Sequence, residues 1–237
     1  MPKNQQDKIR KEVTGFYDTV SHKFSQTRKN WWRELDFIDK YIQPGSKLLD
    51  FGCGNGRLLE LIYGNNLKTN YTGADVSESL IDLARAHYAK EKFVLIESEE
   101  KLPFPDNSFD VAVSVAVFHH LTPKMAESAL KEISRVLKPG GVLVITSWRL
   151  WDWKRVKYLL KSFPRKLIQG GFSKTGRIPF SYHEGGEMKT HWRFCHWWTK
   201  RELENLCRKN GFEILESGYS FDKRNKKRNI YVAGKKG

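Results

Sequence analysis

The residues best suited to chemistry lie in the stretch LLDFGCGNG, from 48 to 56. A short apolar run ends at Asp50, and glycines then alternate with other residues before an apolar run typical of a helix, at 58–62. Glycine adopts positive φ and lets a backbone approach a ligand closely. A helix start offers unpaired N–H groups and the positive end of its dipole. The stretch therefore predicts a strand, a tight turn and a helix that bind a nucleotide-like ligand.

A second acidic residue, Asp75, ends the next predicted strand, at 71–75. An acid at this place accepts both hydroxyls of a ribose in dinucleotide folds. The alternative is that Asp75 caps the following helix, but Ser77 is better placed for that role. We therefore expect Asp75 to bind a ribose, whereas Asp50 either orients the glycine turn through backbone N–H groups or meets a ligand ammonium through water.

The elements that must position these residues alternate between strand and helix. Seven apolar runs predict strands, at 47–51, 71–75, 93–96, 110–115, 142–146, 212–218 and 229–232. Helical patterns precede, separate and follow the first five strands, at 7–20, 30–42, 58–63, 78–88, 124–137 and 200–209. This order implies a doubly wound, mostly parallel α/β sheet of seven strands. The last two strands, joined by a short basic loop, suggest an antiparallel hairpin at one edge.

The length of 237 residues, of which 39% are hydrophobic, suits one domain with an insertion. We divide it into an N-terminal helical cap (1–44), a ligand-binding core (45–147), a basic, Trp-rich insertion (148–198) and a C-terminal helix with a strand pair (199–237). No apolar run reaches the roughly 18 residues that span a membrane, and the N-terminus lacks a signal-peptide core. Three widely spaced cysteines indicate neither disulfides nor a metal site. We expect a cytoplasmic protein.

The formal net charge is +15, and it is concentrated in two segments. Nine basic residues and one acidic residue lie from Arg149 to Arg177, and seven basic residues without an acid follow Asp222. Such clustering favours a nucleic-acid partner over the alternatives of a solvated face or an anionic membrane surface.

The glycine turn, with the form D-x-G-x-G-x-G, resembles motif I of the class I S-adenosylmethionine-dependent methyltransferases. The segments LPFPDNSFD (102–110) and LKPGG (137–141) are similar to two further motifs of this family, so the resemblance covers roughly 45–147. It implies S-adenosyl-L-methionine as the cofactor, bound by Asp50, Gly52, Cys53, Gly54, Asn55, Gly56, Asp75, Val76 and Val115. Many members contact the adenine through an acid four residues before the "LP". Ser98 has that place here, beside Glu99, and either residue is a candidate for the contact.

A closer resemblance, to the tRNA wobble-uridine carboxymethyl methyltransferases, lies outside this core. It is carried by FSQTR (24–28) with Trp31 or Trp32 after it, by SVAVFHH (114–120), by the aromatic stretch 191–198 and by RNIY (228–231). That family methylates the carboxylate of 5-carboxymethyluridine in tRNA. The resemblance implies the anticodon stem-loop of tRNA as a partner. A second partner that it implies is a small zinc-binding activator protein, which eukaryotic members use.

Esterification of a carboxylate needs no strong base, because the acid has a pKa near 4 and is ionised at neutral pH. The enzyme must bring that oxygen to about 3–3.5 Å from the methyl group and hold the anion, for which arginine offers bidentate contacts. Arg28 is our first candidate, and His119 or His120 adds a hydrogen bond. The alternatives are a surface role for Arg28 and a packing role for at least one histidine. Tyr17 either closes over the cofactor or packs in the core.

Six of the eight tryptophans lie between 148 and 198. Aromatic side chains stack on the bases of single-stranded RNA, although we expect about half of these to be buried in a core. The leading hypothesis is thus a methyltransferase that acts on a modified wobble uridine of tRNA. The alternatives are a small-molecule methyltransferase, for a carboxylic acid or a quinone-like precursor, and a non-catalytic protein that binds the cofactor or RNA.

Overall fold

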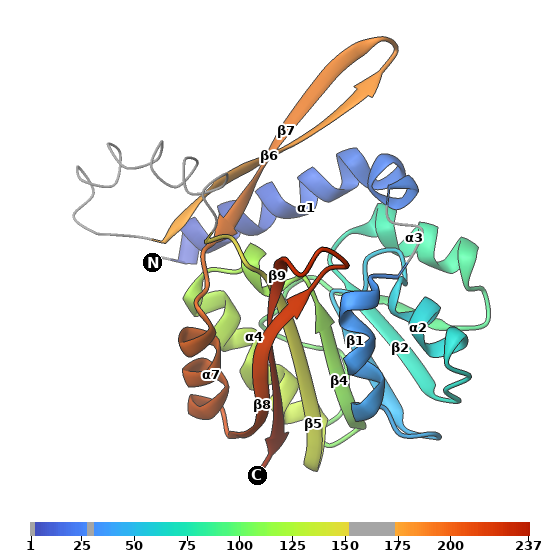
Figure 1. Ribbon diagram of the computed structural model, residues 1–237, viewed down its shortest axis with the longest axis vertical. Coiled ribbons are helices and arrows are strands. Elements are labelled where there is room, and N and C mark those ends of the chain that lie inside the picture. The colour runs from blue at the N-terminus through green and yellow to red at the C-terminus, as the bar shows by residue number, and fades with distance from the viewer. Residues whose placement is uncertain (1–2, 28–30, 152–173) are drawn as a thin grey trace.

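The structure is a computed structural model that describes residues 3–27, 31–151 and 174–237 (Figure 1). The predicted acceptor-binding residue Arg28 lies outside these ranges, as does Trp153. The same holds for the basic residues Lys154, Arg155, Lys157, Lys161, Arg165 and Lys166.

The main sheet has seven strands in the order β3-β2-β1-β4-β5-β9-β8. Its strands are β1 (Lys47–Phe51), β2 (Asn70–Asp75), β3 (Lys92–Leu95), β4 (Phe109–Val115), β5 (Leu137–Trp148), β8 (Phe212–Phe221) and β9 (Lys227–Lys236). The first five are parallel, and β9 runs antiparallel to both β5 and β8. The predicted α/β class, the doubly wound parallel sheet and the antiparallel edge hairpin are therefore confirmed.

Helices cover both faces of this sheet (Figure 1). Leu49 faces a core that includes residues of α4 (Pro123–Val136) and α7 (Lys200–Lys209). The preceding residue, Leu48, faces a second core with residues of α2 (Leu58–Gly64) and α3 (Glu78–His87). Successive side chains of a strand point to opposite faces, so a strand buried on both sides reads as a continuous apolar run.

Two N-terminal helices differ from their predicted form. The first, α1 (Lys3–Gln26), is longer than predicted, and the second, η1 (Arg33–Tyr41), is a 3-10 helix. Leu35 and Ile38 are buried three residues apart, a spacing that suits three residues per turn. None of the helices in the described part of the chain is both long and apolar enough to cross a bilayer.

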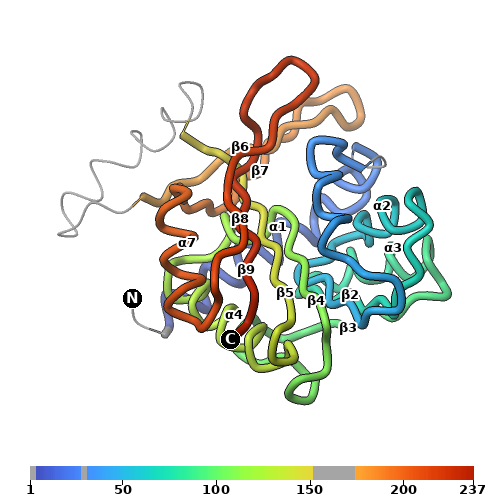
Figure 2. Tube along the Cα trace, turned by 60° about the horizontal axis from the view of Figure 1, so that its bottom comes forward, coloured from blue at the N-terminus to red at the C-terminus, as the bar shows by residue number. Residues whose placement is uncertain are grey.

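The insertion contains an antiparallel hairpin, which the sequence pattern did not indicate. Its strands are β6 (Thr175–Glu184) and β7 (Glu187–His196), and they extend away from the main sheet across α1 (Figure 1). The outer part of the hairpin is exposed on both faces, so it has no alternation of apolar and polar residues to reveal it. Figure 2 shows that the turn between β8 and β9 projects at the same end of the molecule.

Candidate active site

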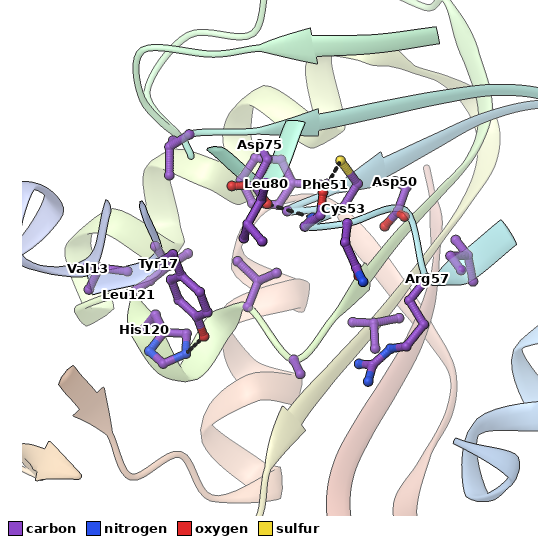
Figure 3. A pocket seen from close by; sticks show the side chains of 18 of the residues that line it. Val13, Tyr17, Asp50, Phe51, Cys53, Arg57, Asp75, Leu80, His120 and Leu121 are labelled. Atoms are coloured by element: carbon purple, nitrogen blue, oxygen red, sulfur yellow. Dashed lines mark hydrogen bonds between the residues drawn. The ribbon is translucent and has the colours of Figure 1, made fainter. Parts of the chain in front are cut away.

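A cavity lies where β1, β2 and β4 end, beneath α1. Most of the predicted cofactor residues line it, namely Asp50, Gly52, Cys53, Gly54, Asn55, Asp75, Val76, Glu99 and Val115. Six Phe, Tyr and Trp residues, which we call the aromatic lining, also line it: Tyr17, Phe24, Trp31, Trp32, Phe51 and Trp148. In Figure 3, Tyr17 and His120 lie together on one side of the cavity, apart from Asp50, Cys53 and Asp75.

The glycine turn has the backbone geometry that its sequence predicts. Gly52 has a φ of 74°, and a Cβ there would lie 2.2 Å from Cγ2 of Val117. The N–H groups of Gly52 and Cys53 both donate to the carbonyl of Ala74, at 2.7 and 3.1 Å. The end of β2 thus fixes the turn that follows β1. Gly56 does not line the cavity, since its Cα faces Tyr88 and Phe93 at close range.

Asp75, rather than Asp50, holds the glycine turn in place. Its carboxylate accepts the N–H of Gly54 at 2.8 Å and that of Ser77 at 3.0 Å. Burial raises the pKa of Asp75, and the backbone N–H groups that it accepts oppose this. Ser77 caps α3 with its own side chain, as predicted. The expectation that Asp50 orients the turn through backbone N–H groups is wrong. The end of β2 places Asp75 beside those N–H groups, and Asp75 accepts them instead.

Asp50 points instead into the face of the sheet, where its side chain is 2% exposed and accepts the hydroxyl of Tyr71 at 2.8 Å. Burial raises the pKa of Asp50 to about 7; the hydrogen bond from Tyr71 lowers it, and the charge of Asp75 raises it. The cavity therefore has a carboxyl group that changes its charge close to neutral pH. The Cys53 thiol beside it is neutral, because burial raises its pKa well above the ordinary value.

Of the two residues considered for the adenine contact, Glu99 lines the cavity and Ser98 does not. Arg10 of α1 donates to both oxygens of Glu99, from Nε at 3.0 Å and from Nη2 at 2.7 Å. This pair fastens α1 over the cavity. Ser98 accepts the N–H of Glu100 instead. Sequence reasoning missed Arg10, because no local pattern links it to a residue 89 positions away.

The structure separates the two predicted histidines. His120 lines the cavity, its Nδ1 lies 2.9 Å from the carbonyl oxygen of Phe194, and its Nε2 lies 2.7 Å from the hydroxyl of Tyr17. His119 is buried, and its ring stacks on Trp148 at 4.3 Å. Both belong to the 3-10 turn η2 (Phe118–His120), in which neighbouring side chains point about a third of a turn apart. Only one of two adjacent residues there can face the cavity.

The tryptophans also divide between the cavity, the core and the surface. Trp148 lines the cavity, Trp197 and Trp198 are buried, and Trp192 is 49% exposed on the hairpin. The half-buried Trp151 donates to the carbonyl of Trp197 at 3.2 Å. This group therefore contains both core residues and a residue that lines the cavity.

Besides Arg10, a second basic side chain of the cavity was not predicted. Arg57 directly follows the glycine turn, lines the cavity, and lies over the ring of Trp32 with 3.8 Å between its Cζ and the ring centroid. Its position next to Gly56 is a signal that could have identified it. The cavity thus combines carboxylates, close backbone approach, aromatic faces and a cation, which suits a positively charged nucleoside ligand next to an aromatic second ligand.

Comparisons with known proteins give relatives for the whole chain and for its core. Residues 49–145 match the family described as methyltransferase domain. A putative methyltransferase of Encephalitozoon cuniculi is 33% identical over 87% of this chain and 89% of its own length. The tRNA (carboxymethyluridine(34)-5-O)-methyltransferase of Arabidopsis thaliana is 36% identical over 59% of this chain, which spans 33% of that relative.

Solved structures share the same fold. A SAM-dependent methyltransferase from Methanosarcina mazei is 27% identical, with a TM-score of 0.67 over 87% of this chain and 98% of that chain. A complex between the Haloferax volcanii Trm112 methyltransferase activator and a putative methyltransferase also matches. Its TM-score is 0.63 at 17% identity, over 94% of this chain and 96% of that chain, so the likeness is one of fold alone.

Proposed function

The chain belongs to the class I S-adenosylmethionine-dependent methyltransferases, and we propose that it methylates the carboxylate of a modified wobble uridine in tRNA. Its cofactor is S-adenosylmethionine. The substrate of the Arabidopsis relative supports the acceptor. Because the chain spans a third of that relative, the acceptor is a proposal for this chain.

The residues of the cavity fit the cofactor. Gly54 lines the cavity, and the nearest atom to a Cβ added there is Cδ1 of Leu80 at 3.9 Å, so a ligand can approach the backbone of the turn closely. We propose that Asp75 binds the ribose, that Glu99 meets the adenine, and that Asp50 offers negative charge to the amino-acid portion. When bound, S-adenosylmethionine supplies a methyl group activated by a positively charged sulfur.

The observation that carries the tRNA proposal is the aromatic lining. Trp31, Trp32 and Trp148 contact the same cavity as the glycine turn, and two of these rings are met by a guanidinium, Trp32 by Arg57 and Trp148 by Arg193. Aromatic faces stack on the splayed bases of single-stranded RNA, such as those of an anticodon loop.

The charge at this end of the molecule supports the same proposal. The turn between β8 and β9, together with the first residue of β9, has four exposed basic residues, Lys223, Arg224, Lys226 and Lys227. It projects at the end of the molecule from which the β6–β7 hairpin extends (Figure 2). We propose that this basic turn contacts tRNA phosphates while one base enters the cavity.

The Tyr17–His120 pair is built to position an acceptor rather than to remove a proton. The Phe194 carbonyl only accepts, so His120 carries its proton on Nδ1 and donates to it. His120 Nε2 then accepts the hydroxyl of Tyr17. Both rings are held in fixed orientations at the cavity, as positioning of an already ionised carboxylate requires. That Arg28 binds the acceptor carboxylate remains a prediction.

The experiment uses the purified full chain with labelled S-adenosylmethionine and two tRNAs that differ only at the wobble base. One carries 5-carboxymethyluridine and the other carries its amide, 5-carbamoylmethyluridine. Nucleoside mass spectrometry should find the methyl ester on the first tRNA and no label on the second. Absence of the ester from the first tRNA would exclude the proposed acceptor and favour a small-molecule substrate.

A second measurement tests the basic turn. The double variant Lys226→Glu with Lys227→Glu should weaken tRNA binding uniformly across tRNAs and flatten its salt dependence, while binding of S-adenosylmethionine stays unchanged. The matched control is Lys131→Glu, an exposed change on α4. Equal effects of the two changes would show that the turn has no special role.

An activator subunit is part of the proposal as well. The eukaryotic members of the resembling family use one, and the Haloferax volcanii complex pairs its methyltransferase with an activator. Co-expression with a small zinc-binding activator, followed by size-exclusion chromatography and the tRNA assay, tests this. We expect co-elution and higher activity; separate elution with unchanged activity would exclude the partner.

A further inference from the structure

Arg193 on β7 is a buried cation whose nearest groups are aromatic. The residue is 3% exposed, and its Cζ lies 4.5, 5.1 and 5.8 Å from the ring centroids of Trp148, Phe16 and Phe180. Within the described residues, no carboxylate forms an ion pair with it and its Nε has no hydrogen-bond partner. The structure pairs other arginines with acids: Arg10 with Glu99, Arg135 with Glu132 and Arg177 with Glu12.

A buried charge without a counterion is costly, so buried cations are normally paired with an anion. Ring faces attract a guanidinium, yet they leave most of its five N–H groups without acceptors. The surroundings of Arg193 therefore stabilise a positive charge incompletely. This is the arrangement expected of a group whose anion arrives with a ligand.

The contacts of Arg193 lead to the cavity. Its Nη1 lies 3.4 Å from the hydroxyl oxygen of Tyr17, whose proton is directed at His120 over 2.7 Å. Figure 3 shows the Tyr17 hydroxyl aimed at the His120 ring beside the cavity. Tyr17, His120 and Trp148 all line the cavity, and Arg193, which does not line it, contacts Tyr17 and Trp148.

We propose that Arg193 is a positioning residue for an anionic acceptor. Its charge attracts a carboxylate to the surface formed by Tyr17, His120 and Trp148, and its N–H group fixes the direction of the Tyr17 hydroxyl. This inference rests on the proposed function in taking the anion to be the carboxylate that is methylated.

The chemistry of the transfer predicts how such a charge acts. One carboxylate oxygen forms a bond to the methyl carbon while the carbon–sulfur bond breaks, and the electron pair of that bond stays on sulfur. The negative charge of the acceptor and the positive charge of the sulfur disappear together. A fixed cation therefore stabilises the bound acceptor more than the transition state, and it should lower KM rather than raise kcat.

The test compares Arg193→Met, which removes the charge at similar size, with Arg193→Lys, which keeps it. With tRNA bearing 5-carboxymethyluridine, we expect Arg193→Met to raise KM about tenfold or more, with a much smaller change in kcat. Arg193→Lys should recover much of the loss. Thermal unfolding should show that Arg193→Met is at least as stable as the wild type, because a poorly compensated buried charge has gone.

The opposite pattern would overturn the inference. If Arg193 has only a structural role, Arg193→Met lowers the melting temperature and kcat together, and Arg193→Lys behaves alike. Arg193→Gln provides a second neutral variant should the methionine fail to fold, and an unchanged KM in either soluble neutral variant also contradicts the proposal.

A binding measurement separates this inference from the proposed function. If the wild type forms no ester on tRNA, the acceptor is wrong, but the anion site is still tested by thermal unfolding in sodium acetate against sodium chloride at equal ionic strength. We expect acetate to stabilise the wild type and Arg193→Lys more than Arg193→Met. Equal stabilisation of all three by acetate would refute an anion site at Arg193.

Discussion

The two sides of the cavity are built in different ways. The acidic side consists of Asp50, Asp75 and Glu99, which lie at or just beyond the carboxyl ends of three neighbouring parallel strands within about a fifth of the chain. The other side combines Tyr17 of α1, His120 of η2 and, behind them, Arg193 of β7, and the first and last are separated by 176 positions. The first side follows from the topology of the sheet, whereas the second depends on how added elements pack over it.

The sides also differ in charge, and this difference suits the proposed methyl transfer to a carboxylate. Carboxylates next to the glycine turn suit a cofactor with a positively charged sulfur and an ammonium group. The buried guanidinium of Arg193 suits an anion. Changes on the first side should therefore alter cofactor binding, and changes on the second side should alter the acceptor reaction with the cofactor still bound.

The largest expected effect comes from Gly52→Ala on the acidic side. An alanine at a φ of 74° is strained, and its Cβ would lie within 2.2 Å of the stiff, β-branched Val117, which also lines the cavity. We expect affinity for S-adenosylmethionine to fall by about 100-fold or more, with a loss of about 2–4 kcal/mol in unfolding free energy. Calorimetric titration and denaturant unfolding measure the two effects.

Gly45→Ala is the matched control for this change. Gly45 has a similar φ of 81°, but no atom lies within 4 Å of an added Cβ. The backbone strain should cost about 1–2 kcal/mol of stability and leave cofactor affinity unchanged. Similar affinity losses in both variants would mean that the close approach at Gly52 has no part in binding.

A smaller loss, about 30- to 100-fold in cofactor affinity, is expected for Asp75→Asn. The amide replaces one acceptor oxygen by a donor, which then faces the N–H of either Gly54 or Ser77. The glycine turn loses its anchor, and the proposed ribose contact loses its charge. Asp110→Asn, at the opposite end of the sheet where Asp110 pairs with Lys138, is the control and should leave affinity unchanged.

The two adjacent histidines test the acceptor side. We expect His120→Gln to reduce turnover of the proposed tRNA acceptor about 10- to 30-fold, because the hydrogen bond that orients the Tyr17 hydroxyl is lost, while cofactor affinity stays the same. His119→Gln should lower stability instead, since His119 is buried against Trp148. Cofactor affinity and single-turnover rates for both variants decide this. A fall in cofactor affinity for His120→Gln would show that His120 contributes to cofactor binding rather than to the acceptor side of the cavity.

The two sides of the cavity also differ in how far the sequence predicts them. The strands of the main sheet were predictable because each contains a short apolar run, and the turn because three glycines follow an acid within seven residues. Asp75 was predictable because a parallel neighbour must end at the same edge of the sheet. These signals are local or follow from a topology that the alternating pattern implies.

The acceptor side could be predicted only in part. The motif that contains His119 and His120 drew attention to both residues, but the phase of a three-residue turn decides which one faces the cavity. Arg193 was not singled out, because a lone arginine among aromatic residues is ambiguous until Phe16 and Trp148 are brought around it. Contacts between elements distant in sequence leave no periodic pattern.

The smallest effect concerns pH and Asp50, whose pKa burial raises from an ordinary value of 3.8 to about 7. A positively charged cofactor favours the ionised carboxyl, so binding lowers this pKa and releases a proton. Affinity for S-adenosylmethionine should therefore be about tenfold weaker at pH 6 than at pH 7.5. Titration calorimetry at pH 6.5 in two buffers of different ionisation enthalpy should detect the released proton, and Asp50→Asn should abolish both the release and the pH dependence.

The same shift has a consequence for stability without cofactor. Below pH 4 the carboxyl is protonated in the folded and the unfolded chain, so it costs nothing. Between pH 4 and pH 7 the unfolded chain loses this proton first, and folding becomes progressively less favourable. The melting temperature of Asp50→Asn relative to that of the wild type should thus increase as pH rises from 4 to 7, and the difference should stay constant above pH 7. A difference that does not change with pH would mean that the buried carboxyl is already ionised. In that case its negative charge would attract the cofactor equally at pH 6 and pH 7.5. The acidic side of the cavity would then be more negative than the acceptor side at every pH in this range.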